Sequence, residues 1–481
     1  MGRSVLIYSP ISGQGHLDSW ARLMARGLLS RGWDVKLLAP SGEPLLDDLA
    51  ETESSGSATI LDWEALFAAR RPSATRISRI RFAWEITFWT ARRYFRRGAS
   101  TAAADAGTRR TKYKRMLGHV LLPPLYICMV LVRTSFSRIR RMLPSNPDSG
   151  RLDPMVFGQM VSAANEVQEF DFVLNLYLDY YRKSEDAWLE FARQWDFRWA
   201  GIRFDSRQDD REGYWSSPTL TGILVLDKSL AKVLQESNPQ RVIEYLPDVT
   251  DVSLPGNSPP LVQTMLRRAQ GRHIVFLGGS LAKRKNLSLW FRVVEQSDAT
   301  QWFFVQVGEV LRHTLTKEDS RLYRRIVAHC PENLMIIPHY LDCEADFNSL
   351  IAESDIVFAV YRDFRQSSNM IAKASAFGKP IIVSDAHLMG QQVRKYGIGR
   401  VVNETQADEV IQAMADCAIG PPDQECFRRF NNDHSEGSYA NAADAFLAKC
   451  IGSAEETSRD SLKISFEGWK SDSQAIVDDK L

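Results

Sequence analysis

The stretch SVLIYSPISGQGHLDSWARLMARGLLSRGWDVKLLAP, residues 4–40, carries the clearest fold signal in the chain. SVLIYSP is a short apolar run of the kind that forms a buried parallel strand. After a turn that contains glycines, apolar residues recur at helical spacing until Gly32, a residue type that commonly ends helices. WDVKLLAP is the next strand, so the stretch predicts a β-α-β unit with a right-handed crossover and a parallel sheet.

Strand and helix patterns alternate again in the rest of the chain. The segment LPDVTDVSLPGNSPP, residues 246–260, is rich in Pro, Ser, Gly and Asp and is typical of a linker. Beyond it, apolar runs such as HIVFLG and PIIVS alternate with helical patterns, which predicts a second doubly wound sheet. We therefore predict an α/β protein with an N-terminal Rossmann-like domain at 1–250, a linker at 251–262, a C-terminal domain at 263–451 and a flexible polar tail at 452–481.

The composition is that of a soluble globular protein, with 44% hydrophobic and 25% charged residues among 481. The N-terminus reaches Gly and Gln before any long apolar core, so we expect no signal peptide. The six cysteines are scattered and form no C-x-x-C pair, which argues against a disulfide framework or a zinc site. We expect a cytoplasmic protein without a metal ion or cofactor.

One segment is strongly basic and partly apolar. From Arg70 to Arg141 there are 18 Lys and Arg residues and two acids, and the run from Met116 to Val132 has no formally charged side chain. That run is slightly shorter than the roughly 18–20 residues that usually span a membrane, and two central prolines would break a helix. We therefore predict a helical insertion at about 70–145 that contacts an anionic membrane surface from the cytoplasmic side.

Two alternatives for the basic segment remain open. It could be a buried helical hairpin within the first domain. Its aromatic and basic residues at 82–97 could also stack on nucleic acid, but the adjoining apolar run favours lipid. We therefore predict no nucleic-acid partner.

Residues 270–405 carry motifs that resemble glycosyltransferase family 4. GGSLAKRKN, at 278–286, is similar to the family's G-R-L and K-G motifs, with Lys285 at the lysine position, Ser280 at the arginine position and Asn286 at the glycine position. KASAFGKP, at 373–380, resembles the family's A-x-A-x-G-x-P, and YGIGRVV resembles its G-x-G-x-L-V. The resemblance implies the GT-B fold, in which two Rossmann-like domains face a central cleft.

The chain differs from that family at the positions of the two acids in the family's E-x7-E motif. Arg365 and Lys373 stand where the E-x7-E motif has its first and second glutamate. In the family, the second carboxylate typically holds the donor ribose hydroxyls and the first lies near the sugar. Arg and Lys have no hydrogen-bond acceptor, so this hydroxyl recognition does not carry over.

The residues around these two positions could still bind the donor diphosphate without the two acids. Hydroxyl and amide residues precede the helix of the second motif, and the free N–H groups of a helix N-terminus bind phosphate. Cations in two loops of one sheet edge could stabilise a leaving diphosphate. The predicted donor residues are Gly279, Ser280, Lys283, Lys285, Arg365, Ser367, Ser368, Asn369 and Lys373. The alternative is that the serines only cap a helix and the cations are solvated.

The turn ISGQGH supplies a candidate for the chemical step. Gly13 and Gly15 allow the backbone to approach an acceptor closely, and His16 follows at the expected start of the first helix. Several inverting GT-B families have a similar G-H, whose histidine removes the proton of the acceptor hydroxyl, and the pKa of histidine suits this role. The alternative is a loop histidine that only forms hydrogen bonds. Retaining transferases need no such base, so the stereochemistry stays open.

Taken with the resemblance, these features predict a glycosyltransferase that uses a nucleotide diphosphate sugar. Its acceptor would be a lipid-linked molecule or a polysaccharide at the inner face of the cell membrane. Loss of both acids leaves a non-catalytic GT-B scaffold as an alternative. Another GT-B activity, such as a nucleotide-sugar epimerase, is a third reading.

Overall fold

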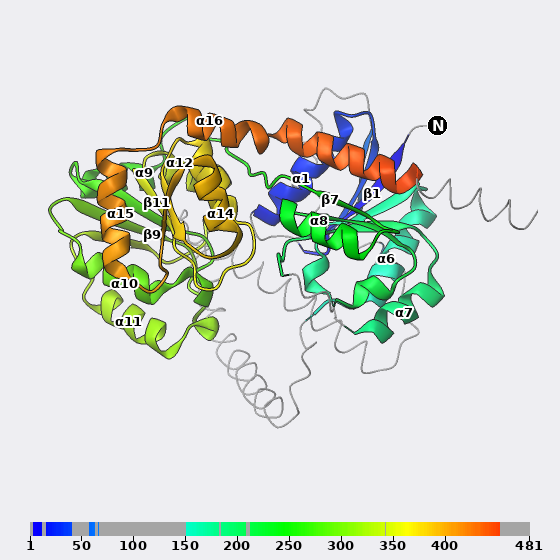
Figure 1. The fold of residues 1–481 in the computed structure, drawn as a ribbon, viewed down its shortest axis with the longest axis horizontal. Coiled ribbons are helices and arrows are strands. Elements are labelled where there is room, and N and C mark those ends of the chain that lie inside the picture. Colours follow the sequence, from blue (N-terminus) through cyan, green and yellow to red (C-terminus); the bar gives the residue numbers. More distant parts are fainter. Residues whose placement is uncertain are drawn as a thin grey trace, which may run out of the picture.

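The computed structural model describes residues 3–11, 16–40, 57–62, 66, 151–181, 184–207, 212–341 and 343–452. They form two parallel sheets, each enclosed by helices (Figure 1). The predicted insertion at about 70–145 and the tail beyond residue 452 lie outside the described residues. Within the described part, no helix combines the length and apolarity that a membrane crossing requires.

The first sheet has seven strands in the order β3-β2-β1-β4-β5-β6-β7. The strands are β1 (Ser4–Tyr8), β2 (Asp34–Ala39), β3 (Ala58–Asp62), β4 (Phe172–Asn175), β5 (Trp199–Arg203), β6 (Leu220–Val225) and β7 (Val242–Tyr245). All neighbours pair in parallel, and Val5 lies opposite Val35 where β1 meets β2. The predicted β-α-β unit is therefore present, with α1 (His16–Leu29) as its crossover helix.

Four described α-helices of this half precede the linker. They are α1, α6 (Pro154–Val167), α7 (Glu185–Gln194) and α8 (Lys228–Ser237). Local sequence explains where two of them begin, because the Asp153 and Asp227 carboxylates accept main-chain N–H groups of the first turns of α6 and α8. On one face, Trp188 stacks on Trp199 with ring centroids 5.2 Å apart, within a buried aromatic cluster.

The second sheet is also parallel and has six strands in the order β10-β9-β8-β11-β12-β13. The strands are β8 (His273–Gly278), β9 (Trp302–Val307), β10 (Leu334–Ile337), β11 (Ile356–Ala359), β12 (Ile381–Ser384) and β13 (Gly399–Val402). The accompanying helices are α9 (Pro260–Ala269), α10 (Leu287–Gln296), α11 (Lys317–Ala328), α12 (Glu344–Ala352), α13 (Asn369–Ala376), α14 (His387–Tyr396), α15 (Ala407–Ile419) and α16 (Gln424–Asp433). Strand order reverses between β8 and β11, where parallel sheets bind ligands.

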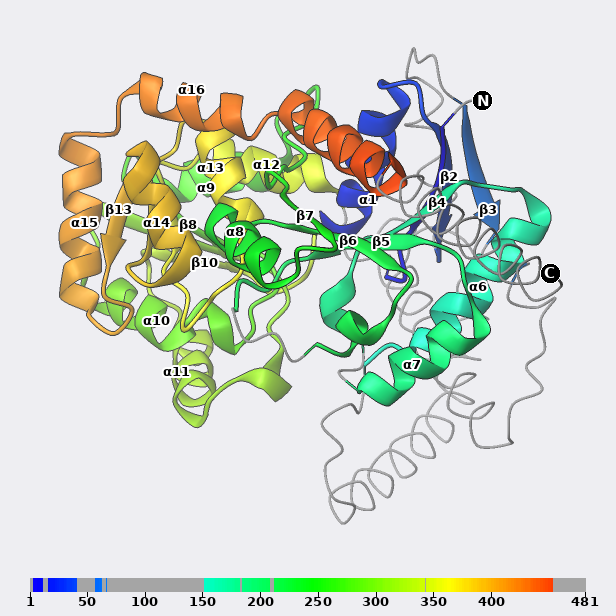
Figure 2. The same ribbon diagram turned by 45° about the vertical axis from the view of Figure 1, so that its right-hand side comes forward.

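The chain returns to the first sheet at its end. After α16, a helix described for residues 436–452 runs back along α1, as Figures 1 and 2 show in orange to red. Tyr439 and Phe446 are buried in the core around α1, and the Trp33 indole donates to the Asp444 carboxylate at 2.8 Å. Residues 436–452, which the sequence pattern placed with the second domain, therefore stabilise the first.

Candidate functional site

The candidate site lies at the carboxyl ends of β8 and β11, where the second sheet reverses its strand order. Gly279 follows β8 with φ +100°, and Gly308 follows β9 with φ +130°. A Cβ on Gly308 would stand 2.0 Å from the Gly279 carbonyl oxygen, so only glycine permits these two loops to touch. The close packing fixes the backbone that leads into the motif at 278–286.

Lys285 is the most unusual residue of this edge. Its side chain is buried, with the residue 6% exposed, and its Nζ lies 2.5 Å from the Tyr361 hydroxyl and 4.0 Å from the centre of that ring. Burial, followed by the nearby charge of Arg284, lowers the pKa of Lys285 well below its usual value. Among the described residues no carboxylate pairs with it. A Cβ on Gly279 would lie only 3.5 Å from Nζ, so the missing side chain leaves space beside the amine.

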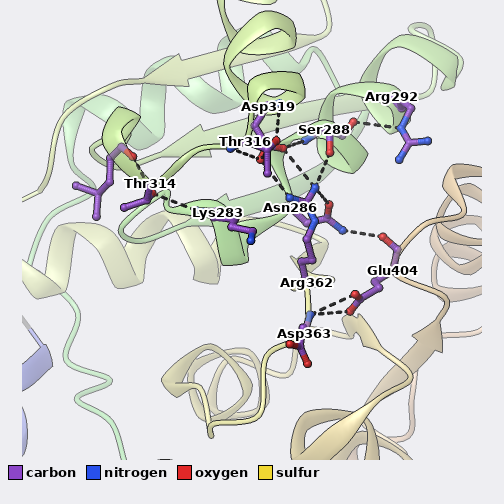
Figure 3. Close-up of polar contacts among 11 residues, drawn as sticks. Lys283, Asn286, Ser288, Arg292, Thr314, Thr316, Asp319, Arg362, Asp363 and Glu404 are labelled. Carbon is purple, nitrogen blue, oxygen red and sulfur yellow. Dashed lines mark hydrogen bonds and ion pairs between the residues drawn. The ribbon is translucent and has the colours of Figure 1, made fainter. Parts of the chain in front are cut away.

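Asn286 keeps the backbone shape that a glycine would give. Its φ of 54° and ψ of 50° are left-handed, a conformation that Asn tolerates better than most residues. The asparagine therefore supports a left-handed turn after Lys285 that a glycine would also permit. This turn is held from outside by Arg362, whose guanidinium donates to Asn286 Oδ1 at 2.9 Å and to Ser288 Oγ at 2.8 Å (Figure 3).

Arg362 also ties this loop to α11. Its Nη1 lies 3.2 Å from the carboxylate of Asp319, whose side chain is fully buried. Burial acts to raise the pKa of Asp319, but hydrogen bonds from Thr316 and Arg362 lower it below its usual value. An open pocket of about 490 Å³ lies on the outer side of this network, lined by Asn286, Ser288, Arg292, Thr316, Lys317, Glu318, Arg362, Glu404 and Thr405.

The predicted phosphate loop follows β11. Ser368 is the N-cap of α13 and accepts the main-chain N–H of Met370 at 3.4 Å. Ser367 Oγ donates to the carboxylate of Asp248 in the linker. The Arg365 side chain is about half exposed and lies beside Asp363, while its carbonyl oxygen accepts a hydrogen bond from Ser206 Oγ of the first domain.

Ser206 follows β5, so this contact brings the carboxyl ends of the two sheets together. Tyr180 follows β4 of the first sheet. The positive charge of Arg284, which lies on the second sheet's side of the same junction, acts on Tyr180 electrostatically. Asp179 precedes Tyr180 in the chain, and burial raises the pKa of Asp179 to about 6. Hydrogen bonds from the Phe204 and Asp205 N–H groups to its carboxylate oppose this rise.

The predicted donor residues do not all lie in one place. Gly279, Lys285 and the serines before α13 occupy the facing loops, and Ser280 and the exposed Lys283 continue the β8 loop. Lys373 points elsewhere: its side chain is 0% exposed and reaches Asp251 O, Asn348 Oδ1 and Glu344 Oε1 at 2.6, 2.5 and 2.8 Å. All three N–H groups of its ammonium are therefore used within the protein.

The first-domain candidates are only partly visible. His16 begins α1, but the structure describes its backbone alone, and Gly13 and Gly15 lie outside the described residues. The sequence motifs do not single out Tyr361 and Arg362, although their place just after β11, at a ligand-binding sheet edge, could have identified them. No group of metal-binding side chains occurs within the described ranges.

Comparison with known proteins rests on structure, because the sequence matches no protein-family model and no curated protein. A glycosyltransferase from Rickettsia africae matches with a TM-score of 0.55 at 11% identity, covering 94% of this chain and 98% of the other. The chain has the GT-B fold. The HepE protein of Anabaena, solved in complex with UDP and glucose, matches with a TM-score of 0.51 at 11% identity over 94% of this chain and 99% of its own.

The GT-B prediction is confirmed by these matches and by the two parallel sheets. A UDP-N-acetylglucosamine 2-epimerase from Listeria monocytogenes, described as putative, also matches, with a TM-score of 0.52 at 11% identity over 95% of this chain and 98% of its own. At such identities the GT-B fold alone is shared. The resemblance to glycosyltransferase family 4 stays a prediction.

Proposed function

We propose that the protein is a glycosyltransferase whose donor is a nucleotide diphosphate sugar. The observation that carries the proposal is Lys285, a buried amine beside Gly279 that has no acid partner among the described residues. Leaving a buried ammonium without a counter-charge is costly, and a bound anion would remove that cost. A diphosphate would supply such an anion, and HepE of Anabaena, which shares the GT-B fold, was solved in complex with UDP-glucose.

Each loop would contribute to holding the diphosphate. Lys285 would gain its missing counter-charge, and the exposed Lys283 and Arg365 would add positive charge around it. Ser367, Ser368 and the first N–H groups of α13 would donate to phosphate oxygens, as helix N-termini do. These donors would stabilise the negative charge that develops when the nucleoside diphosphate leaves. Lys373, which has no free N–H, would act by fixing α13.

For the chemical step we propose His16 as the general base. The acceptor hydroxyl oxygen would attack the anomeric carbon, its proton would pass to the imidazole, and the bond to the diphosphate would break. The acceptor we propose is a lipid-linked molecule or a polysaccharide at the cytoplasmic face of the membrane. This part rests on the sequence from Arg70 to Arg141, with its 18 bases and two acids.

Titration calorimetry with UDP-glucose, UDP-N-acetylglucosamine, GDP-mannose and the free diphosphates tests donor binding directly. We expect at least one donor and its diphosphate to bind the wild type, and Lys285→Met to weaken both. Lack of binding by every ligand of this set would leave the non-catalytic scaffold as the better reading. Conversion of UDP-N-acetylglucosamine to its 2-epimer would instead support the epimerase function that the Listeria match raises.

A further inference from the structure

Asp248 joins the proposed phosphate loop to the junction between the domains. It lies in the linker just after β7, and the residue is 7% exposed. Its carboxylate accepts a hydrogen bond from Ser367 Oγ, whereas its main-chain carbonyl oxygen lies 3.2 Å from Nδ1 of His434, at the end of α16. One residue thus contacts both the loop and the segment that returns to the first domain.

The linker around Asp248 is held from both sides. The Trp20 indole of the first domain donates to Val249 O at 2.9 Å, and Arg22 reaches the Asp251 carboxylate at 2.5 Å. From the second domain, Asn348 Nδ2 donates to the carbonyl oxygens of Asp251 and Ser253 at 3.1 and 2.9 Å. The position of the linker, and with it that of Asp248, is therefore fixed relative to the loop.

No cation offsets the Asp248 carboxylate within the described part of the chain. Ser367 from the loop donates to it, and Tyr245 from β7 and Tyr439 from the returning helix interact with it electrostatically. His434, at the end of α16, contacts the main-chain carbonyl oxygen of Asp248. Burial lowers the pKa of His434 to about 4 and raises those of both tyrosines, so all three are neutral near pH 7. Burial also raises the pKa of Asp248 to about 6, against the opposing effect of Ser367.

An anion at the phosphate loop would compete with Asp248 for the same hydroxyl. Ser367 Oγ has one proton to donate, and in the free protein it donates that proton to the carboxylate. A phosphate oxygen that accepted this hydrogen bond would leave Asp248 without a donor and would place a second negative charge near it. Both changes disfavour the ionised carboxylate.

We propose that Asp248 is a positioning residue that responds to binding of the diphosphate at the phosphate loop. When the diphosphate binds, Ser367 donates its hydrogen bond to a phosphate oxygen instead of to Asp248, and Asp248 takes up a proton from solvent. This inference rests on the proposed function, because the anion is the donor diphosphate. The proton goes to a carboxylate oxygen of Asp248, which then donates back to Ser367 Oγ while the serine proton turns to the phosphate. By linkage, donor affinity rises as the pH falls toward 6.

Calorimetry of the full chain in buffers of different ionisation enthalpy counts the protons taken up on binding. The probe is whichever of UDP-glucose, UDP-N-acetylglucosamine and GDP-mannose binds most tightly, because their diphosphate diesters do not titrate near neutral pH. At pH 6.5 to 7 we expect Asp248→Asn to take up roughly half to one proton fewer than wild type. Its affinity should also lose a pH dependence of up to about tenfold per unit between pH 6 and 8.

Asp251→Asn is the matched control, three residues along the same linker. Arg22 pairs with that carboxylate, and despite partial burial its pKa lies below its usual value, so the control should leave proton uptake unchanged. If Asp248→Asn does not fold, Ser367→Ala removes the same contact without altering charge and should reduce uptake as well.

Binding with equal proton uptake in wild type and variants would overturn this inference alone. Failure of all three donors to bind would overturn the proposed function and this inference with it.

Discussion

The ammonium of Lys373 donates to the main-chain carbonyl of Asp251 at 2.6 Å, joining α13 to the linker between the two sheets. The same ammonium pairs with Glu344 at 2.8 Å and donates to Asn348 at 2.5 Å, both on α12. Burial lowers the pKa of Lys373, while the charge of Glu344 acts to raise it. Lys373 thus fastens the helix that follows the proposed phosphate loop.

Lys373→Met should destabilise the fold, because it leaves Glu344 and two acceptors at the junction without their cation. Removal of one partner from a buried ion pair typically costs about 3–5 kcal/mol, and the partial exposure of Glu344 favours the lower end. Urea unfolding measures the change. The double variant Lys373→Met/Glu344→Gln should recover part of the loss, and a cost below about 1 kcal/mol in the single variant would show that the junction does not depend on Lys373.

Lys285→Met should weaken donor binding without weakening the fold. Loss of a charge-assisted contact of about 1.5–3 kcal/mol corresponds to a roughly tenfold to hundredfold rise in Kd. Lys317→Met, which removes an exposed lysine at the start of α11, is the matched control and should bind donor as the wild type does. Equal weakening by both changes would indicate a diffuse effect of charge and not a site at Lys285.

Stability measured against pH gives a second readout for Lys285. Its pKa is lowered in the folded state, so between that lowered value and the ordinary pKa the unfolded chain binds more protons than the native one. Wild-type stability should therefore rise with pH across this interval. The difference between wild type and Lys285→Met isolates the contribution, and it should shrink or reverse toward alkaline pH. A difference that does not vary with pH would mean that Lys285 is charged in the folded protein.

The sequence predicts the parts of this fold that depend on short-range pattern. Apolar runs and helical spacing predict the strands and helices of both sheets, and strand order then places the loops after β8 and β11 at one edge. These features are local, or follow from the parallel βαβ topology.

Side-chain pairing between distant segments is what the sequence does not reveal. The intact motif around Lys373 predicts that this residue belongs to the donor site. In the structure, however, the partners of its ammonium lie on α12 and in the linker. The contact of Ser367 with Asp248 spans 119 residues. Periodicity also does not tell which sheet a helix will cover, so the return of residues 436–452 to the first domain is set by tertiary packing.

Arg362→Met should loosen the loop that presents Lys285. Asp319 would lose the guanidinium that faces it, and Asn286 and Ser288 would lose their shared donor. We expect a loss of about 2–4 kcal/mol in unfolding free energy, in the range of broken buried charge networks. Hydrogen exchange at 283–288 should also become faster.

Two further variants separate geometry from charge at this position. Arg362→Lys should recover little, because a single ammonium cannot reproduce the forked contacts of the guanidinium. Arg292→Met removes a cation from the same pocket wall. Within the described part of the chain the Arg292 side chain makes only a 3.4 Å hydrogen bond to Ser288 O, so this variant should behave as wild type. Full stability in Arg362→Lys would show that charge alone suffices.

His16→Ala should lower turnover far more than donor affinity if His16 is the general base. Loss of such a base typically reduces the rate by about 10²–10⁴-fold. The wild-type rate should fall at acid pH as the imidazole becomes protonated, and the variant should lose this dependence. An unchanged rate and pH profile, in a variant with an intact fold, would assign His16 a structural role at the start of α1.

The basic and apolar segment leads us to expect binding to anionic membranes. It has 18 bases against two acids between Arg70 and Arg141 and an uncharged run from Met116 to Val132. Apolar insertion and attraction to anionic lipid act together in such segments, and each Lys or Arg near the surface contributes about 1 kcal/mol. The protein should therefore sediment with anionic liposomes and much less with neutral ones, and high salt should weaken this association without abolishing it.

Two sets of substitutions locate the membrane contact. Replacement by Gln in the segment should reduce sedimentation with anionic liposomes while leaving the fold intact; the residues are Arg109, Arg110, Lys112, Lys114 and Arg115. The matched control replaces five exposed bases elsewhere and should bind as wild type; they are Lys232, Arg267, Lys317, Arg321 and Arg324. Equal loss in both sets would reflect total charge and not this segment. If the wild type stays in the supernatant with both kinds of lipid, the segment is an internal hairpin, and a lipid-linked acceptor loses its support.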